Sequence, residues 1–492
     1  MLKLSGQGPL YLQLYRAIQQ DILTGALISG DQLPASRELA KTLSLSRNVV
    51  VQCYEQLASE GYIHSKQGAG SFISDVFIHL DSSMTQESAQ IPQPTVEISQ
   101  NAKSMLPMWE QYRLDLQNPI TPKIDFQYGN VGVDHRLEQQ LRTNLRNQGA
   151  GISPNYQHPA GLIRLREVIA KYVRQYRGVN CRADQILITN GSQEGLTIVA
   201  QMLLNPGDSV IMEDPGYRGA TQSFKSVSAQ ISTVNVDRFG LCTEELPVTE
   251  GRGSPSHVKL LYTTPSHQFP TGGVMPLERR IALLQWAKSN QVMILEDDYD
   301  SEFRYQGPPI ESIHGMDDSS QTIYMGTFSK IISPVLRTGF LVLPDQLIEP
   351  ACAIQWTHNR HSPLVIQQML GEYLDSVHFI RHLRRMRKRY SERRTVLIEA
   401  LDEHFGDQIR VHGTNAGIHL TAWTSLPVER ESELIQIALD HGLGIHTVTS
   451  LYRKTPKNIG LLMGYANLAN SEIRKGVKIL AQCVKLIDPP PH

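Results

Sequence analysis

Apolar positions repeat at two different spacings along the chain, and the change in spacing divides the chain into parts. In residues 10–59 they recur every three or four residues, which predicts amphipathic helices. From about residue 125 onward, short apolar runs alternate with helical stretches, which predicts a mostly parallel β-sheet with helices on its faces. Residues 76–104 show neither pattern, and their polar, proline-bearing composition is typical of a flexible linker.

The N-terminal part predicts a small α+β unit. Helical spacing over residues 10–23 ends before a glycine, and Ser36 is expected to cap a second helix over 37–43. A third helix is predicted from Arg47 to about residue 59, and a hairpin with a glycine-rich tip follows it. Two short helices joined by a tight turn and followed by a hairpin describe a winged helix-turn-helix.

This unit offers polar and basic side chains where a DNA-binding domain uses them. Arg47 and Asn48 begin the predicted third helix, the element that reaches base edges in helix-turn-helix proteins, and Lys66 lies in the hairpin. From the pattern alone, the alternative is a small helical interaction domain whose arginines and lysines are merely solvated.

Two stretches closely resemble the GntR family of bacterial regulators. They are Leu-Pro-Ala-Ser-Arg-Glu-Leu-Ala-Lys-Thr-Leu-Ser-Leu-Ser-Arg-Asn-Val-Val over residues 33–50, and the hairpin segment that begins Glu-Gly-Tyr-Ile and ends Gly-Ala-Gly-Ser-Phe over residues 60–72. The resemblance implies that residues 1–75 form a winged helix-turn-helix domain that binds a double-stranded DNA operator. The DNA-contacting residues it implies are Arg37, Ser46, Arg47, Asn48, Lys66 and Gly68.

Residues 105–492 predict a larger α/β part. Its clearest strands are expected over residues 185–189, 209–213, 259–263, 292–295, 322–325 and 339–343, with helices that include 196–204 and 277–289. The last portion, residues 363–491, mixes a long helix with strands, as a smaller α+β lobe would.

The long helix of this portion carries a dense run of basic residues from Arg381 to Arg394. Its apolar residues Ile380, Leu383 and Tyr390 fall on one side, so the basic residues line the rest of the helix. One interpretation is a solvated face or a dimer contact. The other is a path for the DNA backbone between two protomers.

The overall composition narrows the class of protein. The 492 residues carry a formal net charge of −1, so any contact with DNA must come from a local patch. The five cysteines lie far apart without a Cys-x-x-Cys pair, which fits a reducing compartment and predicts no metal site. No apolar run reaches membrane-spanning length and the N-terminus lacks the apolar core of a signal peptide, so a cytoplasmic protein is expected.

Two predicted strand ends carry the residue types of a cofactor site. The apolar run 323–325 is followed by Lys330, and the run 292–295 is followed by Asp297 and Tyr299. In open α/β sheets, ligands bind at such strand ends. A carboxylate, a phenol and a lysine suit pyridoxal phosphate (PLP): the lysine forms a Schiff base, the carboxylate keeps the pyridine nitrogen protonated, and the phenol hydrogen-bonds the ring oxygen.

From about residue 120 the chain resembles the fold type I aminotransferases, which depend on PLP. The resemblance rests on Asn-Tyr-Gln-His-Pro-Ala-Gly over residues 155–161, Thr-Asn-Gly-Ser-Gln-Glu-Gly over 189–195, Glu-Asp-Pro-Gly-Tyr over 213–217 and Phe-Pro-Thr-Gly over 269–272. It implies a cofactor site of Ser192, Gln193, Tyr217, Asp297, Tyr299, Thr327, Lys330 and Arg337, with Tyr156 reaching the cofactor of the other subunit in a homodimer. Lys330 would be the catalytic residue if the protein turns over substrate at all.

A GntR-type reader joined by a linker to an aminotransferase-like domain resembles the MocR subfamily of regulators. The segments over residues 265–272 and 296–303 are characteristic of that subfamily. This resemblance implies a PLP-binding transcription regulator. The chain departs from the aminotransferase pattern at Phe269, where an asparagine is usual, and His267 and Gln268 are the candidates to replace its hydrogen bond to the ring oxygen.

The residues that would bind an amino-acid effector also depart from the pattern. No arginine immediately precedes the Gly-Leu-Leu run that starts at residue 460, and Arg453 or Lys457 could serve only if the loop folds back. The expected effector is therefore PLP itself or a PLP-reactive amino compound, with target genes in vitamin B6 or amino-acid metabolism. Two alternatives remain: a working aminotransferase with a DNA-binding appendage, and a repressor whose aminotransferase-like part is only a dimerisation scaffold.

Overall fold

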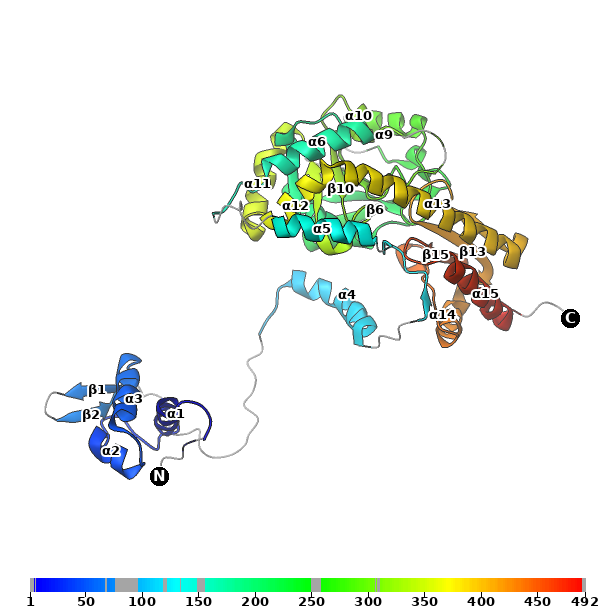
Figure 1. Ribbon diagram of the computed structural model, residues 1–492. Coiled ribbons are helices and arrows are strands. Elements are labelled where there is room, and N and C mark those ends of the chain that lie inside the picture. The colour runs from blue at the N-terminus through cyan, green and yellow to red at the C-terminus, as the bar shows by residue number, and fades with distance from the viewer. Residues whose placement is uncertain are drawn as a thin grey trace. The chain divides into compact units, whose positions relative to one another are not determined.

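The computed structural model describes residue 4 and residues 6–66, 69–75, 96–117, 122–132, 134–147, 155–248, 258–305, 307 and 310–488. The chain divides into two compact units, Met1–Glu97 and Ile98–His492 (Figure 1). Each unit has its own hydrophobic core. Gly68, one of the predicted DNA contacts, lies outside the described residues. Within the described part, no helix is both long and apolar enough to cross a membrane.

The first unit is a winged helix-turn-helix, as predicted. Its elements are α1 (Leu10–Leu23), α2 (Ser36–Thr42), α3 (Arg47–Ser59), β1 (Ile63–Lys66) and β2 (Gly70–Ile73). The two strands pair antiparallel as a hairpin, and Leu14, Ile18, Val50 and Leu57 are fully buried between the helices. Because these apolar side chains recur at helical spacing, the helices bury one face each and leave the other exposed.

Helices α2 and α3 of this unit differ in how their N-termini are capped. The Ser46 hydroxyl accepts a hydrogen bond from the backbone N–H of Val49 (3.4 Å), so it caps α3. The predicted cap at Ser36 is wrong: Ser36 is the first residue of α2, and Ala35 holds the capping position without a side-chain bond. Ala35 is the last residue with an extended backbone (φ −56°, ψ 142°), and Ser36 is already helical. The helix therefore begins one residue earlier than a serine cap at Ser36 would predict.

The second unit is built on an eight-stranded sheet with strand order β4-β11-β10-β9-β8-β5-β6-β7. The bounds are β4 (Ile186–Thr189), β5 (Ser209–Asp214), β6 (Gln230–Asp237), β7 (Gly240–Leu241), β8 (Val258–Thr263), β9 (Met293–Asp298), β10 (Thr322–Thr327) and β11 (Gly339–Val342). From β10 to β6 each strand is parallel to its neighbour, whereas β11 runs antiparallel to both β10 and β4. The mostly parallel sheet is thus confirmed.

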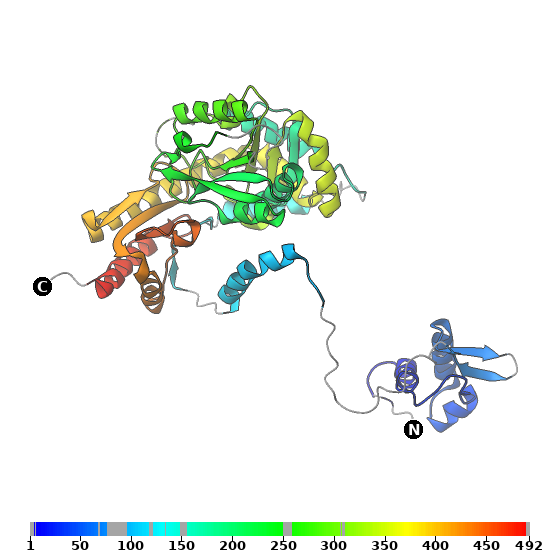
Figure 2. The same ribbon diagram turned by 180° about the vertical axis from the view of Figure 1, so that it is seen from behind.

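Helices cover both faces of this sheet. They are α5 (His135–Asn147), α6 (Ile163–Arg177), α7 (Ser192–Leu203), α8 (Arg218–Ser226), α9 (Leu277–Asn290), α10 (Ile313–Met316), α11 (Asp345–Asn359) and α12 (Leu364–Leu374). Along β10 the side chains alternate between two cores: Tyr324 packs in the core with residues of α6 and α12, and Met325 in the core with residues of α7. Figure 1 shows α5, α6 and α12 on the near face, and Figure 2 shows the sheet from behind.

The C-terminal portion forms the predicted smaller lobe. It comprises α13 (Val377–Phe405), β12 (Ile409–His412), β13 (His419–Pro427), α14 (Glu431–Asp440), β14 (Leu443–Gly444), β15 (Asn458–Gly464) and α15 (Asn470–Ile487). Strands β12, β13 and β15 make an antiparallel sheet, and β14 pairs in parallel with β3 (Ile124–Asp125). A further helix, α4 (Gln100–Gln117), begins inside the segment for which we expected a linker.

Several basic residues of α13 have partners within the chain. Arg385 forms an ion pair with Asp134 (2.8 Å), and Arg387 donates to the backbone oxygen of Glu302. Arg393 and Arg394 also donate to backbone oxygens of other segments. Part of the basic run therefore holds α13 against its surroundings, and neither of the two predicted uses of its exposed face is decided by these contacts.

Candidate functional site

The carboxyl ends of β9 and β10 lie side by side and open into one cavity. In the parallel pairing, Asp297 of β9 lies opposite Met325 of β10, five residues before Lys330. The cavity measures about 250 Å³, near the lower end of small-molecule sites. It is lined by Tyr128, Gly129, Ser192, Gln193, Tyr217, Tyr262, Thr264, Phe269, Asp297, Tyr299, Thr327, Ser329, Lys330, Pro334, Arg337, Ile418 and His419. The structure thus brings together eight of the nine predicted cofactor-site residues.

Lys330 points its amine into this cavity. The Nζ atom donates a hydrogen bond to the backbone oxygen of Gly129 (2.9 Å). Burial lowers the pKa of Lys330, and the nearby carboxylates of Asp300 and Asp297 oppose that shift. Gly129 has a φ of +82°, a backbone conformation that favours glycine, and a Cβ there would lie 2.6 Å from Nζ and displace the amine. A lysine whose neutral form is favoured by burial is suited to attack a carbonyl group.

Asp297 presents an unsatisfied oxygen to the same space. Its Oδ2 atom accepts a hydrogen bond from the Tyr262 hydroxyl (2.7 Å), whereas Oδ1 is buried without a partner among the described residues. Burial raises the pKa of Asp297 to about 7, and the bond from Tyr262 opposes the rise. A buried carboxylate oxygen without a donor is costly, so a ligand that brings an N–H group would complete the site.

Tyr262 is a functional candidate that sequence reasoning missed. It lies within the apolar run of β8 and is fully buried, so the pattern marks it only as core. The available signal was chemical, because a phenol in the middle of a buried strand needs a hydrogen-bond partner. Here that partner is Asp297 on the neighbouring strand.

Tyr299 and the residues around it form a buried polar cluster. The Tyr299 hydroxyl lies 3.0 Å from the backbone oxygen of His267 and 3.1 Å from its Nδ1 atom. His267 in turn lies 3.0 Å from the Asp300 carboxylate. Gln268 is bound to Glu213 and to the backbone oxygen of Pro215. Neither His267 nor Gln268 lines the cavity, because other groups already engage their side chains, and Phe269 lines it instead.

An anion cradle lies at the start of α7. Ser192 and Gln193 are its first two residues, and they follow Gly191 (φ +81°). The Arg337 guanidinium donates to the backbone oxygen of Asn190 (3.1 Å), and a Cβ at Gly191 would lie 2.9 Å from it. Free backbone N–H groups at the start of a helix, together with an arginine, bind phosphate well.

Thr327 and Ser329 add two hydroxyl groups to the same cavity. The Thr327 hydroxyl donates to that of Ser329 (3.1 Å) and accepts from the Ser329 backbone N–H (3.2 Å). Both residues line the cavity, and Ser329 was not predicted. An anion cradle, a lysine amine and a carboxylate lacking a donor line this one cavity, and they fit the phosphate, the aldehyde and the ring nitrogen of PLP.

Tyr156 and the candidate carboxylate-binding residues lie elsewhere. Tyr156 is 81% exposed, with its ring 5.9 Å from that of His361. The backbone N–H of Arg453 donates to Asp214 (2.9 Å), and its guanidinium donates to the backbone oxygen of Ile231 (2.9 Å). Within the described part of the chain, Arg337 is the only arginine that lines the cavity.

The predicted DNA-contacting residues gather on the first unit. Ser46, Arg47 and Asn48 are exposed at the start of α3, and Arg37 is exposed on α2. Lys66 is exposed at the end of β1, with its amine 5.5 Å from the Phe72 ring centroid. None of these basic residues forms an ion pair with a described carboxylate, so their charge is available to a phosphate backbone.

Comparison with known proteins agrees with both halves of this description. The family described as "Bacterial regulatory proteins, gntR family" matches residues 10–73, and "Aminotransferase class I and II" matches residues 121–479. The uncharacterized HTH-type transcriptional regulator YdeL of Bacillus subtilis is 34% identical and covers 97% of each chain. The probable rhizopine catabolism regulatory protein MocR of Rhizobium meliloti is 32% identical, over 96% of this chain and 93% of its own.

A third relative and a solved structure add detail. The HTH-type pyridoxine biosynthesis transcriptional regulator PdxR of Corynebacterium glutamicum is 28% identical over 96% of each chain. The crystal structure of Pyrococcus horikoshii kynurenine aminotransferase matches 80% of this chain and 97% of its own, with 25% identity and a TM-score of 0.71. The expected union of a GntR-type reader with an aminotransferase fold is confirmed.

Proposed function

Since the chain belongs to the MocR-type transcription regulators of the GntR family, we propose that it binds PLP at Lys330 and that occupancy of this site changes its affinity for DNA. One observation carries the proposal. The Asp297 Oδ1 atom is buried without a donor, in the same cavity as the Lys330 amine and the anion cradle of α7. A scaffold for dimerisation alone has no need of this arrangement.

Eight residues of the cavity have a role toward the cofactor in this proposal. When bound, PLP supplies an aldehyde that reacts with amines. Lys330 provides the amine, Asp297 holds a proton at the ring nitrogen, and Tyr299 orients the ring oxygen. Tyr217 packs on the ring. The phosphate is held by Ser192, Gln193, Thr327 and Arg337.

We propose a sensor rather than an enzyme, because the cavity lacks a clamp for a substrate carboxylate. Among the described residues that line it, the single arginine is Arg337, which the phosphate requires. Arg453 is directed to β6, and Phe269 occupies the place of the usual asparagine. Without a clamp, a substrate is poorly aligned for proton transfer. PLP itself, or an amino compound that reacts with it, is then the effector. The name of the relative PdxR supports target genes in vitamin B6 metabolism, with amino-acid metabolism as the other possibility.

A second candidate function, an aminotransferase with a DNA-binding appendage, is favoured by one observation. Lys330, Asp297 and the anion cradle are all in place, so the groups needed for a half-reaction are not lost. The two functions differ in what happens after an amino acid is added. A sensor forms at most one equivalent of keto acid, whereas an enzyme continues to turn over.

We also propose that the protein is a homodimer in which Tyr156 completes the cofactor site of the other subunit. The 81% exposure of Tyr156 outside its own cavity supports this role. A linker within residues 76–104 would then allow the two readers to engage two half-sites of an operator. Sedimentation of the full-length protein at micromolar concentration tests the proposal: a dimer is expected, and a monomer in the presence of PLP contradicts it.

Attachment and turnover are tested on one preparation. The full-length protein is incubated with PLP, reduced with borohydride and digested, and the labelled peptide is identified. We expect the label on the peptide that contains Lys330, no label in Lys330→Ala, and less than one equivalent of keto acid from any of the common amino acids. A label on another lysine rejects the site, and many turnovers at enzyme-like rates favour the second function.

A further inference from the structure

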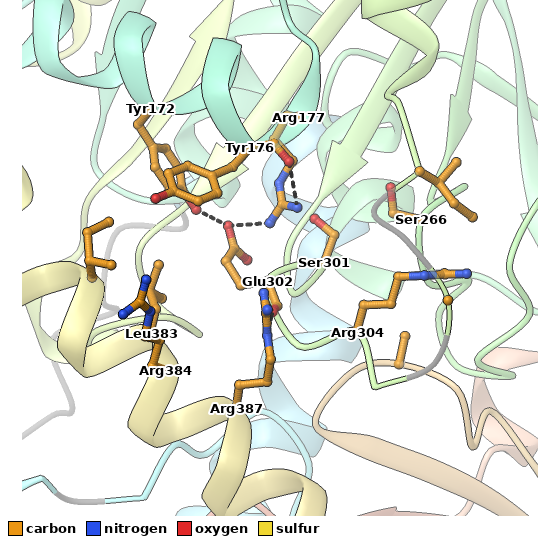
Figure 3. A pocket seen from close by; sticks show the side chains of 14 residues that line it. Tyr172, Tyr176, Arg177, Ser266, Ser301, Glu302, Arg304, Leu383, Arg384 and Arg387 are labelled. Carbon is orange, nitrogen blue, oxygen red and sulfur yellow. Dashed lines mark hydrogen bonds and ion pairs between the residues drawn. The ribbon is translucent and has the colours of Figure 1, made fainter.

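A second pocket lies beside the cofactor cavity and shares none of its lining residues. It measures about 280 Å³ and is enclosed by α6, α13 and the segment that follows β9. Figure 3 shows side chains from these three sources pointing toward one another, among them Tyr172, Glu302 and Arg387. The segment after β9 continues directly from Tyr299, so the two hollows are separated by only a few residues of chain.

One arginine of this pocket is already neutralised. Arg177 of α6 lies 2.6 Å from the Glu302 carboxylate and 3.2 Å from that of Asp298, and all three side chains are buried. Tyr172 also donates a hydrogen bond to Glu302 (Figure 3). Arg177 offsets only one of the two carboxylate charges, so this cluster keeps a formal charge of −1, which can offset at most one of the further guanidinium groups.

Three more arginines face the pocket without such compensation. Arg304, Arg384 and Arg387 all line it, and none of them lies within 4.0 Å of a carboxylate in the part of the chain that the structure describes. Among the described residues, Arg387 donates only to the backbone oxygen of Glu302. The Arg304 Nε atom is buried and has no hydrogen-bond partner in the described part of the chain, and burial lowers the pKa of Arg304. Converging guanidinium groups that lack counter-charges attract an oxyanion.

The other lining residues indicate what kind of group the ligand carries besides its anionic head. Tyr172 and Tyr176 form an aromatic wall, with their ring centroids 5.3 Å apart, and Ile380 and Leu383 of α13 add aliphatic surface. The sugar-phosphate backbone of DNA could contact the arginines, but it has no apolar group that would pack against this wall. We propose that the pocket is a second small-molecule site, which binds an organic oxyanion with a carboxylate or phosphate head and an apolar or aromatic body.

The test uses the full-length protein saturated with PLP and two probes of the same shape, benzoate and phenyl phosphate. Binding is followed by ligand-observed NMR, with acetate and methyl phosphate as probes that lack the body. We expect saturable binding of at least one aromatic probe, at least tenfold tighter than that of the matching small anion. Comparison of benzoate with phenyl phosphate then tells which head group the site prefers.

Variants locate the binding. Arg384→Ala removes an exposed side chain for which the structure shows no partner, and Arg304→Ala removes the guanidinium with the unpartnered Nε atom. Each should weaken the aromatic probe at least tenfold. Arg381→Ala removes the same charge from α13 outside the pocket, and Arg337→Ala alters the cofactor cavity, so both should change the affinity less than twofold.

Three results would overturn the proposal. The first is that neither aromatic probe shows saturable binding at concentrations up to about 10 mM, a dissociation constant that corresponds to a binding free energy of about 3 kcal/mol. The second is binding that survives both Arg304→Ala and Arg384→Ala. The third is equal loss in Arg337→Ala, which would place the probe in the cofactor cavity. The cofactor absorbance of Arg304→Ala, Arg384→Ala and Arg381→Ala, unchanged from the original protein, shows that the fold is retained in these three variants.

Discussion

The DNA-reading unit and the cofactor cavity hold their functional side chains in opposite environments. Arg47, Asn48 and Lys66 are exposed and have no carboxylate partner among the described residues, whereas Asp297 is 5% exposed and its pKa is raised by burial. An exposed charge adds little to stability and is free to meet a ligand. A buried, incompletely paired charge costs stability until its ligand arrives. Substitutions in the reader should therefore change binding alone, and substitutions in the cavity should change binding and stability together.

The largest expected effect is on the stability of the cofactor-free protein. Burial raises the pKa of Asp297 from its ordinary value to about 7, so the folded protein holds this proton more tightly than the unfolded chain does. Stability from this group is fully present below the unfolded pKa, near 4, and is lost as pH rises through 7. Asp297→Asn removes that loss. At pH 8 the cofactor-free variant should be more stable than the original protein by on the order of 4 kcal/mol, and equally stable near pH 4.

Urea unfolding of both proteins at a series of pH values measures this difference. Burial raises the pKa of Glu296 to about 7 as well, so the original protein and the variant share that contribution and the difference between them isolates Asp297. Parallel pH curves for the two proteins would show that Asp297 does not titrate as described.

The next effect is on cofactor affinity. Asp297→Asn should weaken PLP binding about a hundredfold, because the ring nitrogen loses its buried counter-charge. Glu296→Gln is the matched control on the same strand. Glu296 points to the other face of β9, where it accepts hydrogen bonds from the backbone N–H groups of Ile313 (3.0 Å) and His314 (2.9 Å). Absorbance titration with PLP should show less than a threefold change for this control. Equal losses in both variants would mean that the effect is structural.

Arg47→Ala should act on DNA alone. Loss of a base contact at the start of α3 is expected to cost about 1–3 kcal/mol of operator binding and to relax specificity at one position. The free energy of unfolding should change by less than about 0.5 kcal/mol, because Arg47 is exposed. Arg16→Ala removes an equally exposed charge from α1 and serves as the control. Fluorescence anisotropy with operator and scrambled DNA separates the loss of affinity from the loss of specificity. If Arg47→Ala and the original protein bind the operator with equal affinity, Arg47 at the start of α3 does not take part in base recognition.

The smallest effect is expected at the hairpin. If Lys66 neutralises one phosphate, Lys66→Ala should reduce the slope of log affinity against log salt concentration by about one and weaken all sequences alike. The same anisotropy assay, repeated at four salt concentrations, gives the slope. A change in sequence preference with an unaltered slope would instead make Lys66 a base contact.

Strand ends were predictable because parallel strands with both faces buried leave continuous apolar runs. Asp297 and Lys330 could be found because each follows such a run. Strand β6 was missed because it has no such run. It lies near the edge of the sheet, and most of its residues are exposed or only partly buried. Tyr262 was missed because a tyrosine inside an apolar run looks like core.

Contacts between distant segments could not be predicted. Gln268 was a candidate for the cofactor ring, yet its amide is bound to Glu213, 55 residues away in the chain. The arginines of the second pocket come from α6, α13 and the segment after β9, and sequence alone does not show that these three segments lie together. The role proposed for Tyr156 depends on a second chain, which no pattern within one chain describes.

The most direct test of the account is the affinity for DNA with and without cofactor. The full-length protein first selects its operator from a pool of random DNA, and the dissociation constant is then measured for the cofactor-free and the PLP-saturated protein at fixed salt. We predict at least a fivefold difference, since a ligand can act only through unequal affinity for the two states. Lys330→Ala should show no such difference. Identical dissociation constants, in a protein whose Lys330 is shown to carry the cofactor, would contradict the claim that PLP occupancy regulates DNA binding.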